Sequence, residues 1–268
     1  MNGTEHPYKY NGKELNESLG LNWYDYGARR YDPAIARWAS VDPLANKYVN
    51  ISPYAYVANN PIMYIDPDGR EIVVPTSLKG SQRRKIVRNL RKLTNDKLSY
   101  NKSTGKVTVR KSRTGNKTAG TTLVNNLISD TKSTTITIGT SGNKANATNW
   151  ADAQNGTGSD ATVSFDPKSN PDIPTEDSKT GNVSGEKRPN QIGLGHELIH
   201  ADHINNGDVD LTTDTNTYKD ATGTTVTQTV KKEELRTVGL KGVKAGDITE
   251  NNLRSEQKKT KKKKRGAY

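Results

Sequence analysis

Apolar and polar positions recur with different periods along the chain, and each period predicts a type of element. Residues 81–94, SQRRKIVRNLRKLT, place apolar side chains three or four residues apart beneath a basic face, which predicts an amphipathic helix capped by Ser81. The alternation in KVTVRK, residues 106–111, predicts a strand that pairs with residues 97–101 as a hairpin. Helical and strand periods therefore occur side by side in this region.

Other segments also repeat apolar residues with a helical or strand period, and stretches with no such period lie between them. The remaining regular segments predict a helix around 123–128, strands at 134–138 and 161–165, and a hairpin from 209–219 and 223–230. Gly- and Asn-rich stretches near 140–160 and 167–190 are expected to be loops. The elements together predict the α+β class, and no internal repeat is convincing.

Composition changes near residue 70. Nine of the twelve tyrosines and two of the three tryptophans precede Asp66, whereas the later part is rich in Thr, Asn, Lys and Gly. Short extended pieces and turns such as Asn11-Gly12 predict a β-rich aromatic module before this point. We therefore expect two domains, 1–71 and 72–268.

The absence of cysteine excludes several classes of site. A chain of 268 residues with no Cys has no disulfide framework, thiolate metal site or thiol nucleophile, so a metal must be held by His and carboxylate. No apolar run approaches the roughly 20 residues of a membrane helix. The first residues, MNGTEHPYKY, also lack the apolar centre of a signal peptide. We expect no membrane association and no signal peptide in this chain.

The charge is uneven, with 41 basic and 29 acidic side chains. Seven basic residues lie within 258–265, and no acid interrupts them. This run and the pI of about 9.6 raise the alternative of a protein that acts on nucleic acid. The basic tail carries no interleaved aromatic residues, however, so nucleic acid is not the partner that we expect.

The aromatic module resembles a known family over residues 7–71. YDYGARRYDP, the VDP turn, YAYVANNP and DPDG occur here in the order typical of the core-terminating segment of Rhs and YD-repeat proteins. These are large β-shells that carry polymorphic toxins at their C-terminus. The resemblance implies a toxin domain after this segment, the remainder of an Rhs shell as a partner, and a cognate immunity protein.

Two aspartates in this segment match a proposed autoproteolytic pair of that family, Asp42 and Asp66. The chain departs from the pattern after both DP turns, where it has Leu44-Ala45 and Arg70-Glu71. The alternative role for both aspartates is turn formation.

Three of the four histidines lie within GLGHELIHADH. On a helix, His196 and His200 project from one face and can reach one ion, while Glu197 lies beside them to accept a proton from water. This H-E-x-x-H pattern predicts a zinc hydrolase. Asn190 is the expected helix cap and Asn205-Asn206-Gly207 the expected end. His203 is expected outside the ligand set.

A catalytic zinc site needs a third protein ligand, and adjacent acids in KKEELRTVG are the candidates. HELIHADH followed by EELRTVGL resembles the clostridial neurotoxin light chains and related effector zincins. The resemblance implies Glu234 as the third ligand and Glu233 as its support. It also implies catalytic roles for Arg265 and Tyr268, which would stabilise the oxyanion. Glu250 and Arg254 either brace the site or are ordinary helix surface.

The leading hypothesis is a zinc metalloendopeptidase toxin, with a zincin-like domain after an Rhs core tail. Zinc-activated water would attack a peptide bond with Glu197 as general base. The resemblance implies delivery by a bacterial secretion system and a protein substrate inside the target cell. The alternatives are the nucleic-acid-directed toxin and an inactive fragment that closes the Rhs shell.

Overall fold

The computed structural model of the chain describes residues 8–10, 13–16, 22–25, 29–41, 52–56, 72–257 and 263–268. The chain divides into two compact units, Met1–Arg70 and Glu71–Tyr268. In the described residues, no helix has the length and apolar character to cross a membrane. Asp42 and Asp66 lie outside the described residues.

The first unit contains a five-stranded antiparallel meander. Its strands are β1 (Tyr8–Tyr10), β2 (Lys13–Asn16), β3 (Trp23–Asp25), β4 (Arg30–Asp32) and β5 (Arg37–Trp38). Tyr31, Trp38 and Tyr56 form a small aromatic core, in which each ring centroid lies within 5.9 Å of the other two. Aromatic residues therefore supply the buried area that so short a sheet otherwise lacks.

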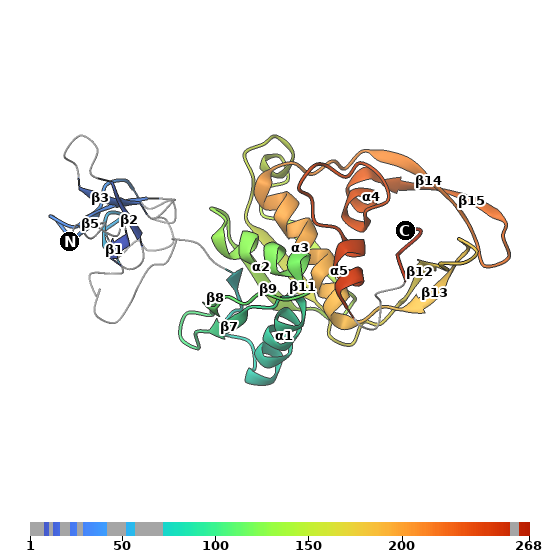
Figure 1. Cartoon of the computed structure of the whole chain (residues 1–268), viewed down its shortest axis with the longest axis horizontal. Coiled ribbons are helices and arrows are strands. Elements are labelled where there is room, and N and C mark those ends of the chain that lie inside the picture. The colour runs from blue at the N-terminus through green and yellow to red at the C-terminus, as the bar shows by residue number, and fades with distance from the viewer. Residues whose placement is uncertain are drawn as a thin grey trace, which may run out of the picture. The chain divides into compact units, whose positions relative to one another are not determined.

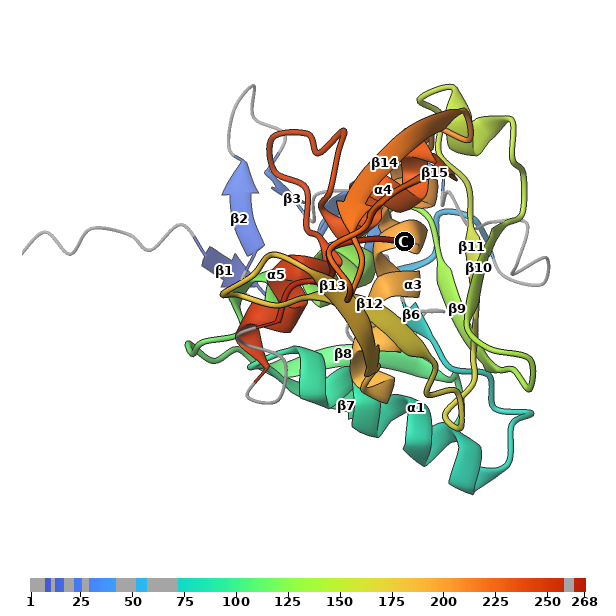
Figure 2. The same ribbon diagram turned by 90° about the vertical axis from the view of Figure 1, so that its right-hand side faces the viewer.

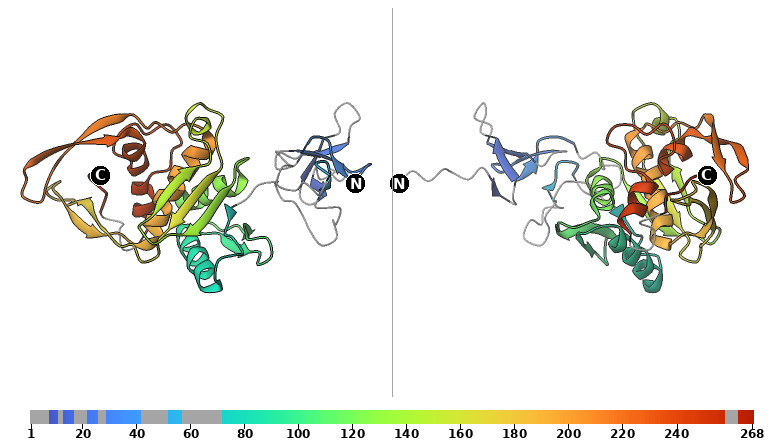
Figure 3. Two further views of the ribbon diagram at one scale, coloured as in Figure 1. Left: turned by 180° about the vertical axis from the view of Figure 1, so that it is seen from behind. Right: turned by 45° about the vertical axis from the view of Figure 1, so that its right-hand side comes forward.

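The second unit is built on a six-stranded mixed sheet in the order β10-β11-β9-β6-β8-β7. The strands are β6 (Ile72–Val73), β7 (Lys97–Tyr100), β8 (Lys106–Lys111), β9 (Thr134–Ile138), β10 (Lys144–Ala147) and β11 (Ala161–Phe165). Strands β6, β9 and β11 are parallel neighbours, and β10 pairs antiparallel with β11 at one edge (Figure 3). Parallel neighbours require crossover connections: α1 and α2 lie in the connection from β6 to β9, and β10 and a short 3-10 helix lie in the connection from β9 to β11.

The described residues of this unit also form the helices α1 (Gly80–Leu93), α2 (Thr118–Ser129), α3 (Asn190–Asn206), α4 (Lys232–Val238) and α5 (Glu250–Glu256), with a short 3-10 helix η4 (Asp152–Gln154). Helix α3 contacts α1, α2, α5 and the strands β10 and β11 (Figure 1). It is buried on nearly every face, so it forms the centre of the main hydrophobic core rather than a surface helix.

Two hairpins flank the C-terminus, β12 (Asp172–Glu176) with β13 (Val183–Lys187), and β14 (Thr213–Lys219) with β15 (Thr225–Lys231). The last residues lie between these hairpins (Figure 2). Arg265 forms a bridge to Thr175 of β12, and Gln228 of β15 donates a hydrogen bond to the carbonyl of Tyr268 at 2.7 Å. The C-terminus is therefore attached from both sides.

The α+β class predicted from the sequence is confirmed, but two local predictions are wrong. The stretches expected to be loops contain β10, η4, β12 and β13. Asp, Pro and Gly weaken the strand signal of β12 and β13, whereas pairing with each other satisfies their backbone groups. The predicted Ser81 cap is also wrong, because α1 begins at Gly80 and the Gln82 side chain accepts the Lys79 N–H at 2.9 Å.

A buried ion pair network joins α4 to the segments around it. The Arg236 guanidinium is 6% exposed and donates to Asp247 at 2.7 Å and to Asp208 at 2.8 Å. Burial by itself would lower the pKa of Arg236, but these carboxylates outweigh that effect and raise it above its ordinary value. The network therefore holds α4 in place beside α3.

Replacing Arg236 with Met is expected to lower the free energy of unfolding by about 3–5 kcal/mol, because two carboxylates lose their shared cation. Chemical denaturation followed by circular dichroism measures this change. Lys187→Met is the control, since its ion pair with Asp172 joins side chains that are 64% and 59% exposed. We expect it to cost less than about 1 kcal/mol, and equal losses in both variants would contradict a special role for the buried network.

Candidate active site

Helix α3 carries the histidines of the H-E-x-x-H pattern at the centre of the second unit. His196, Glu197 and His200 are 3%, 7% and 8% exposed. The helix ends at Gly207, whose φ of 76° is the left-handed conformation that glycine adopts readily, so the expected stop is confirmed. Asn190 is not a cap of this helix, because its side-chain amide donates to the Pro167 carbonyl at 2.6 Å.

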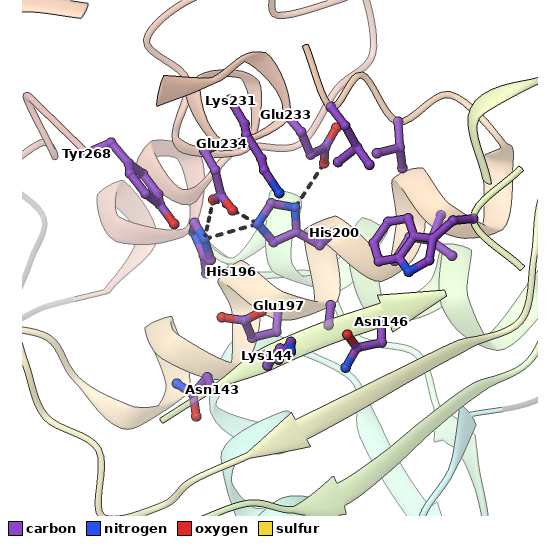
Figure 4. Close-up of a pocket in the computed structure, with 15 residues that line it drawn as sticks. Asn143, Lys144, Asn146, His196, Glu197, His200, Lys231, Glu233, Glu234 and Tyr268 are labelled. Atoms are coloured by element: carbon purple, nitrogen blue, oxygen red, sulfur yellow. Dashed lines mark hydrogen bonds and ion pairs between the residues drawn. The ribbon is translucent and has the colours of Figure 1, made fainter. Parts of the chain in front are cut away.

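Three side-chain atoms converge on one point, the Nε2 atoms of His196 and His200 and one carboxylate oxygen of Glu234 (Figure 4). The two Nε2 atoms are 3.2 Å apart, and Glu234 Oε2 lies 3.3 Å from His196 Nε2 and 3.1 Å from His200 Nε2. Glu234 arrives on α4, which follows directly after β15. These three residues form the group in the described part of the chain that could hold a metal ion.

A second carboxylate contacts the far nitrogen of each histidine. His196 Nδ1 lies 2.9 Å from Glu250 Oε2, and His200 Nδ1 lies 2.9 Å from Glu233 Oε1. Because a carboxylate accepts hydrogen bonds, each Nδ1 carries the hydrogen and donates it. Each Nε2 then presents its lone pair to the common point, which is the tautomer that a metal-binding histidine needs.

The electrostatics of this point favour a cation. Burial by itself would lower the pKa of His200, but hydrogen bonds to Glu233 and Glu234 outweigh it and raise the pKa to about 10. Burial would raise the pKa of Glu250, yet His196 and Arg265 bring it down to about 2. With this raised pKa a proton supplies the positive charge between the two Nε2 atoms, which are 3.2 Å apart, and a divalent cation would take the place of that proton. The donor set therefore fits a divalent metal with imidazole and carboxylate ligands.

Glu233 contacts three side chains from one position in α4. Its Oε1 accepts hydrogen bonds from His200 Nδ1, from His203 Nδ1 at 2.7 Å and from Thr237 Oγ1 at 3.2 Å. These partners keep the pKa of Glu233 below its ordinary range against the opposing effect of burial. His203 thus lies beside Glu233, outside the group of converging atoms, as expected.

The C-terminal residues are connected to the same cluster. Arg265 is 6% exposed and donates through Nη1 to Glu250 Oε2 at 2.9 Å, the oxygen that also accepts from His196. Its guanidinium lies 4.6 Å from the centroid of the Tyr268 ring. The Tyr268 ring in turn stacks near His196, with centroids 6.4 Å apart. Burial of the phenol and the charge of Glu234 hold the pKa of Tyr268 above its ordinary value.

A pocket of about 240 Å³ opens in front of the converging atoms. Glu197, His196, His200, Glu234 and Tyr268 line it, and Figure 4 shows the Glu197 carboxylate on the His196 side of this pocket. Strand β10 and the residue before it form the opposite wall. Arg265 is not among the lining residues and contacts Glu250 and Tyr268 instead.

The structure brings together the sequence-predicted residues His196, Glu197, His200, Glu233, Glu234 and Tyr268 around this pocket. Sequence reasoning left the role of Glu250 open, and it did not identify Thr237 or the wall formed by β10. Thr237 lies four residues after Glu233 in a helix, and this spacing was a usable signal. Arg254 is 1% exposed and lies 3.6 Å from Glu250, so it is not helix surface.

Comparison with protein families matches residues 95–265 to Peptidase_M91, described as "Effector protein". The chain belongs to the Peptidase_M91 family of effector proteins. Every residue that lines the pocket on α3, except Tyr268, lies within the matched residues.

Other proteins are similar to shorter parts of the chain. Toxin subunit YenC1 of Yersinia entomophaga is 42% identical over 66 residues, which are 25% of this chain and 6% of that protein. Salivary gland surface protein 1 of Aedes aegypti is 46% identical over 63 residues, which are 24% of this chain and 2% of that protein. The chain thus spans a small part of the length of these relatives.

Two solved structures of botulinum neurotoxin light chains are also similar. The zinc-removed type C light chain is 16% identical with a TM-score of 0.28, covering 53% of this chain and 32% of that chain. The serotype HA light chain is 21% identical with a TM-score of 0.29, covering 47% and 33%. At these TM-scores the likeness carries no argument about the site.

Proposed function

We propose that the chain is a zinc-dependent endopeptidase of the H-E-x-x-H type with Glu234 as third ligand. The observation that carries this proposal is the convergence of His196 Nε2, His200 Nε2 and Glu234 Oε2 within 4.8 Å of one another. Glu250 and Glu233 support it, because they set the tautomer of both imidazoles. Bound zinc supplies Lewis acidity, which acidifies water and polarises the peptide carbonyl.

Glu197 acts as general base in this proposal. Its carboxylate lines the pocket next to His196, where it can accept the proton of the attacking water and return it to the leaving amine. The Tyr268 phenol lines the same pocket and keeps its hydrogen because its pKa is raised. It therefore remains a hydrogen-bond donor for the oxyanion that forms in the transition state. Arg265 positions Tyr268 by stacking and His196 through Glu250.

An endopeptidase must bind a chain on both sides of the cleaved bond. Strand β10 ends the order of the sheet and pairs on one side with β11, so its other edge can pair with an extended segment of substrate. Residues 143–146 line the pocket along this edge. An exposed strand edge beside the reactive point supports a substrate that binds in extended conformation.

Residues 1–71 are proposed to be an Rhs core tail and 72–268 the zincin-like toxin domain. The proposal includes delivery into a target cell, a protein substrate there, an immunity protein and the remainder of the Rhs shell as partners. Membership in an effector family supports delivery and a protein substrate. Self-cleavage at Asp42 and Asp66 remains a prediction, which substitution of either residue and mass analysis of the purified chain would test.

Elemental analysis and a cleavage assay test the function directly. We expect one zinc per chain, hydrolysis of a peptide library, and loss of hydrolysis on chelation that added zinc reverses. Nuclease activity without bound metal would instead support the nucleic-acid-directed toxin. Absence of metal and of any activity would support an inactive shell-closing fragment.

Replacing Tyr268 with Phe is expected to reduce turnover by about 10²- to 10³-fold, because the oxyanion loses one donor whose interaction strengthens as charge develops. Zinc content measured by elemental analysis should not change. Tyr218→Phe, in β14, is the control and should keep parental turnover. Parental turnover in Tyr268→Phe would remove the phenol from the mechanism and leave the metal site unaffected.

A further inference from the structure

Trp150 is an exposed aromatic side chain at the pocket that the proposed chemistry does not use. In the described part of the second unit, the exposed large apolar side chains are Trp150, Val243 and Tyr268, at 40%, 48% and 39% exposure. Two of these three, Trp150 and Tyr268, line the pocket. Large apolar surface beside a pocket is characteristic of recognition rather than of folding.

The segment that carries Trp150 is firmly attached, so the exposure is not the result of a loose loop. The Asn149 side chain accepts the Ala151 N–H at 2.9 Å and donates to Asp152 at 2.7 Å. The Ala153 carbonyl accepts the Val209 N–H at 3.0 Å. Ala153 itself is fully buried in the main core. The indole is therefore presented to solvent by a fixed backbone.

The same segment is also fastened to the end of α3. Gly158 has φ of 74°, and a Cβ at this position would lie 1.9 Å from the Asn205 carbonyl oxygen. Only glycine permits this close approach. The Ser159 N–H donates to the Ile204 carbonyl at 2.9 Å, and the Asn205 side chain donates to the Ser159 carbonyl at 2.8 Å. Trp150 thus keeps its place relative to the helix of the reactive histidines.

Apolar side chains surround this end of the pocket. Besides Trp150, the lining includes Ala145, Ile204, Val209 and Leu211. Ile204 and Val209 belong to the main core, at 1% and 6% exposure, and Leu211 packs against it. These apolar side chains, called the apolar wall below, carry no charge, and the core packs against Ile204, Val209 and Leu211. Such a wall gains free energy by covering an apolar side chain from water.

The apolar wall lies to one side of the reactive point. Figure 4 shows Tyr268 on the His196 side of the two imidazoles and Asn146 on the His200 side. The chain continues from Asn146 through the end of β10 to Trp150. A substrate segment extended along β10 therefore passes the reactive point and places one side chain against the apolar wall.

We propose that Trp150, with Ile204, Val209 and Leu211, forms a subsite that selects substrates by one large apolar side chain at a fixed position from the cleaved bond. Aromatic and branched aliphatic side chains fit this chemistry, whereas small or charged side chains leave the indole uncovered. The inference rests on the proposed function for its link to cleavage. The subsite itself is a binding property of the described residues.

A cleavage profile tests the selection. The zinc-loaded full chain is incubated with a synthetic random peptide library, and the cut positions are identified by mass spectrometry. We expect Phe, Tyr, Trp, Leu, Ile and Met to be enriched at a single position. Trp150→Ala should lose this enrichment, with a roughly 10- to 100-fold lower kcat/KM on a Phe-containing peptide. Trp150→Phe should retain it, and Val243→Ala is the matched control for loss of an exposed apolar side chain.

A binding measurement separates failure of the subsite from failure of the proposed function. The Glu197→Gln chain is used so that the peptide is bound without being cleaved. Trp150 is the sole tryptophan after residue 70, and subtracting the fluorescence of the same chain with Trp150→Ala leaves the emission of Trp150. Acetyl-Ala-Phe-Ala-amide should shift this emission to shorter wavelength, and acetyl-Ala-Ser-Ala-amide should not. Cleavage without positional preference, or equal response to both peptides, overturns the subsite. An emission shift without any cleavage supports the subsite and contradicts the peptidase mechanism.

Discussion

Replacing Glu197 with Gln is expected to reduce peptide hydrolysis by about 10²- to 10⁴-fold while zinc content stays that of the parent. The amide keeps the size of the side chain and can still form hydrogen bonds, but it cannot accept the proton of the attacking water. Glu197 does not belong to the group of converging ligand atoms, so the metal site should remain complete. Turnover of a peptide library and elemental analysis on the same preparation measure the two effects.

Glu176→Gln provides the control for loss of one carboxylate, because Glu176 is exposed on β12 and lies outside the pocket. It should leave both turnover and zinc unchanged. If Glu197→Gln hydrolyses peptides at the parental rate, the general base is a different group. If it loses zinc as well, Glu197 is needed to hold the metal, and the assigned roles of the α3 residues are wrong.

Replacing His200 with Ala is expected to abolish stoichiometric zinc, and hydrolysis with it. The substitution removes one of the three converging side-chain atoms, and it removes one of the two imidazole partners of Glu233 and of Glu234. Elemental analysis after gel filtration gives the metal content. Circular dichroism checks that the variant is folded, because His200 lies in the central helix of the core.

His203→Ala is the matched comparison, because His203 lies on the same helix and also donates to Glu233 but has no atom at the converging point. It should keep zinc at saturating concentration, and its loss of affinity should be smaller than the roughly 10- to 100-fold that is typical when a direct partner of a metal ligand is removed, because His203 acts only through Glu233. Full zinc retention in a folded His200→Ala variant would place the metal elsewhere. Equal loss of zinc in both variants would contradict the assignment of His200, and not His203, as a metal ligand.

The local geometry of the site could be predicted from the sequence. His196 and His200 are four residues apart, and any helix through them places both imidazoles on one face with Glu197 adjacent. Gly207 was recognisable as the end of that helix because glycine adopts the left-handed conformation that a terminal residue requires. The adjacency of Glu233 and Glu234 to the start of a helix was likewise a local feature.

The partners of these residues depended on the tertiary structure. Glu250 contacts His196 across 54 sequence positions, and Arg265 contacts the same carboxylate from the last residues of the chain. The N-terminus of α2 has no cap from its own flanking residue, and Glu256 of α5 accepts the N–H groups of Ala119 and Gly120 instead. Contacts of this kind leave no periodic signal, because their spacing is set by how helices pack.

The hairpin β12–β13 and the edge strand β10 show the same division. Their composition of Asn, Asp, Pro and Gly favours turns, and pairing with the next strand along the chain makes them strands. A period along the chain reports which face of an element is buried, so the sequence by itself determined the α+β class, and the H-E-x-x-H spacing determined the helix that carries the candidate metal-binding histidines. The sheet order, the carboxylate behind each imidazole and the position of Trp150 at the pocket were decided by tertiary packing, since backbone hydrogen bonding and burial outweigh local preference once the chain is compact.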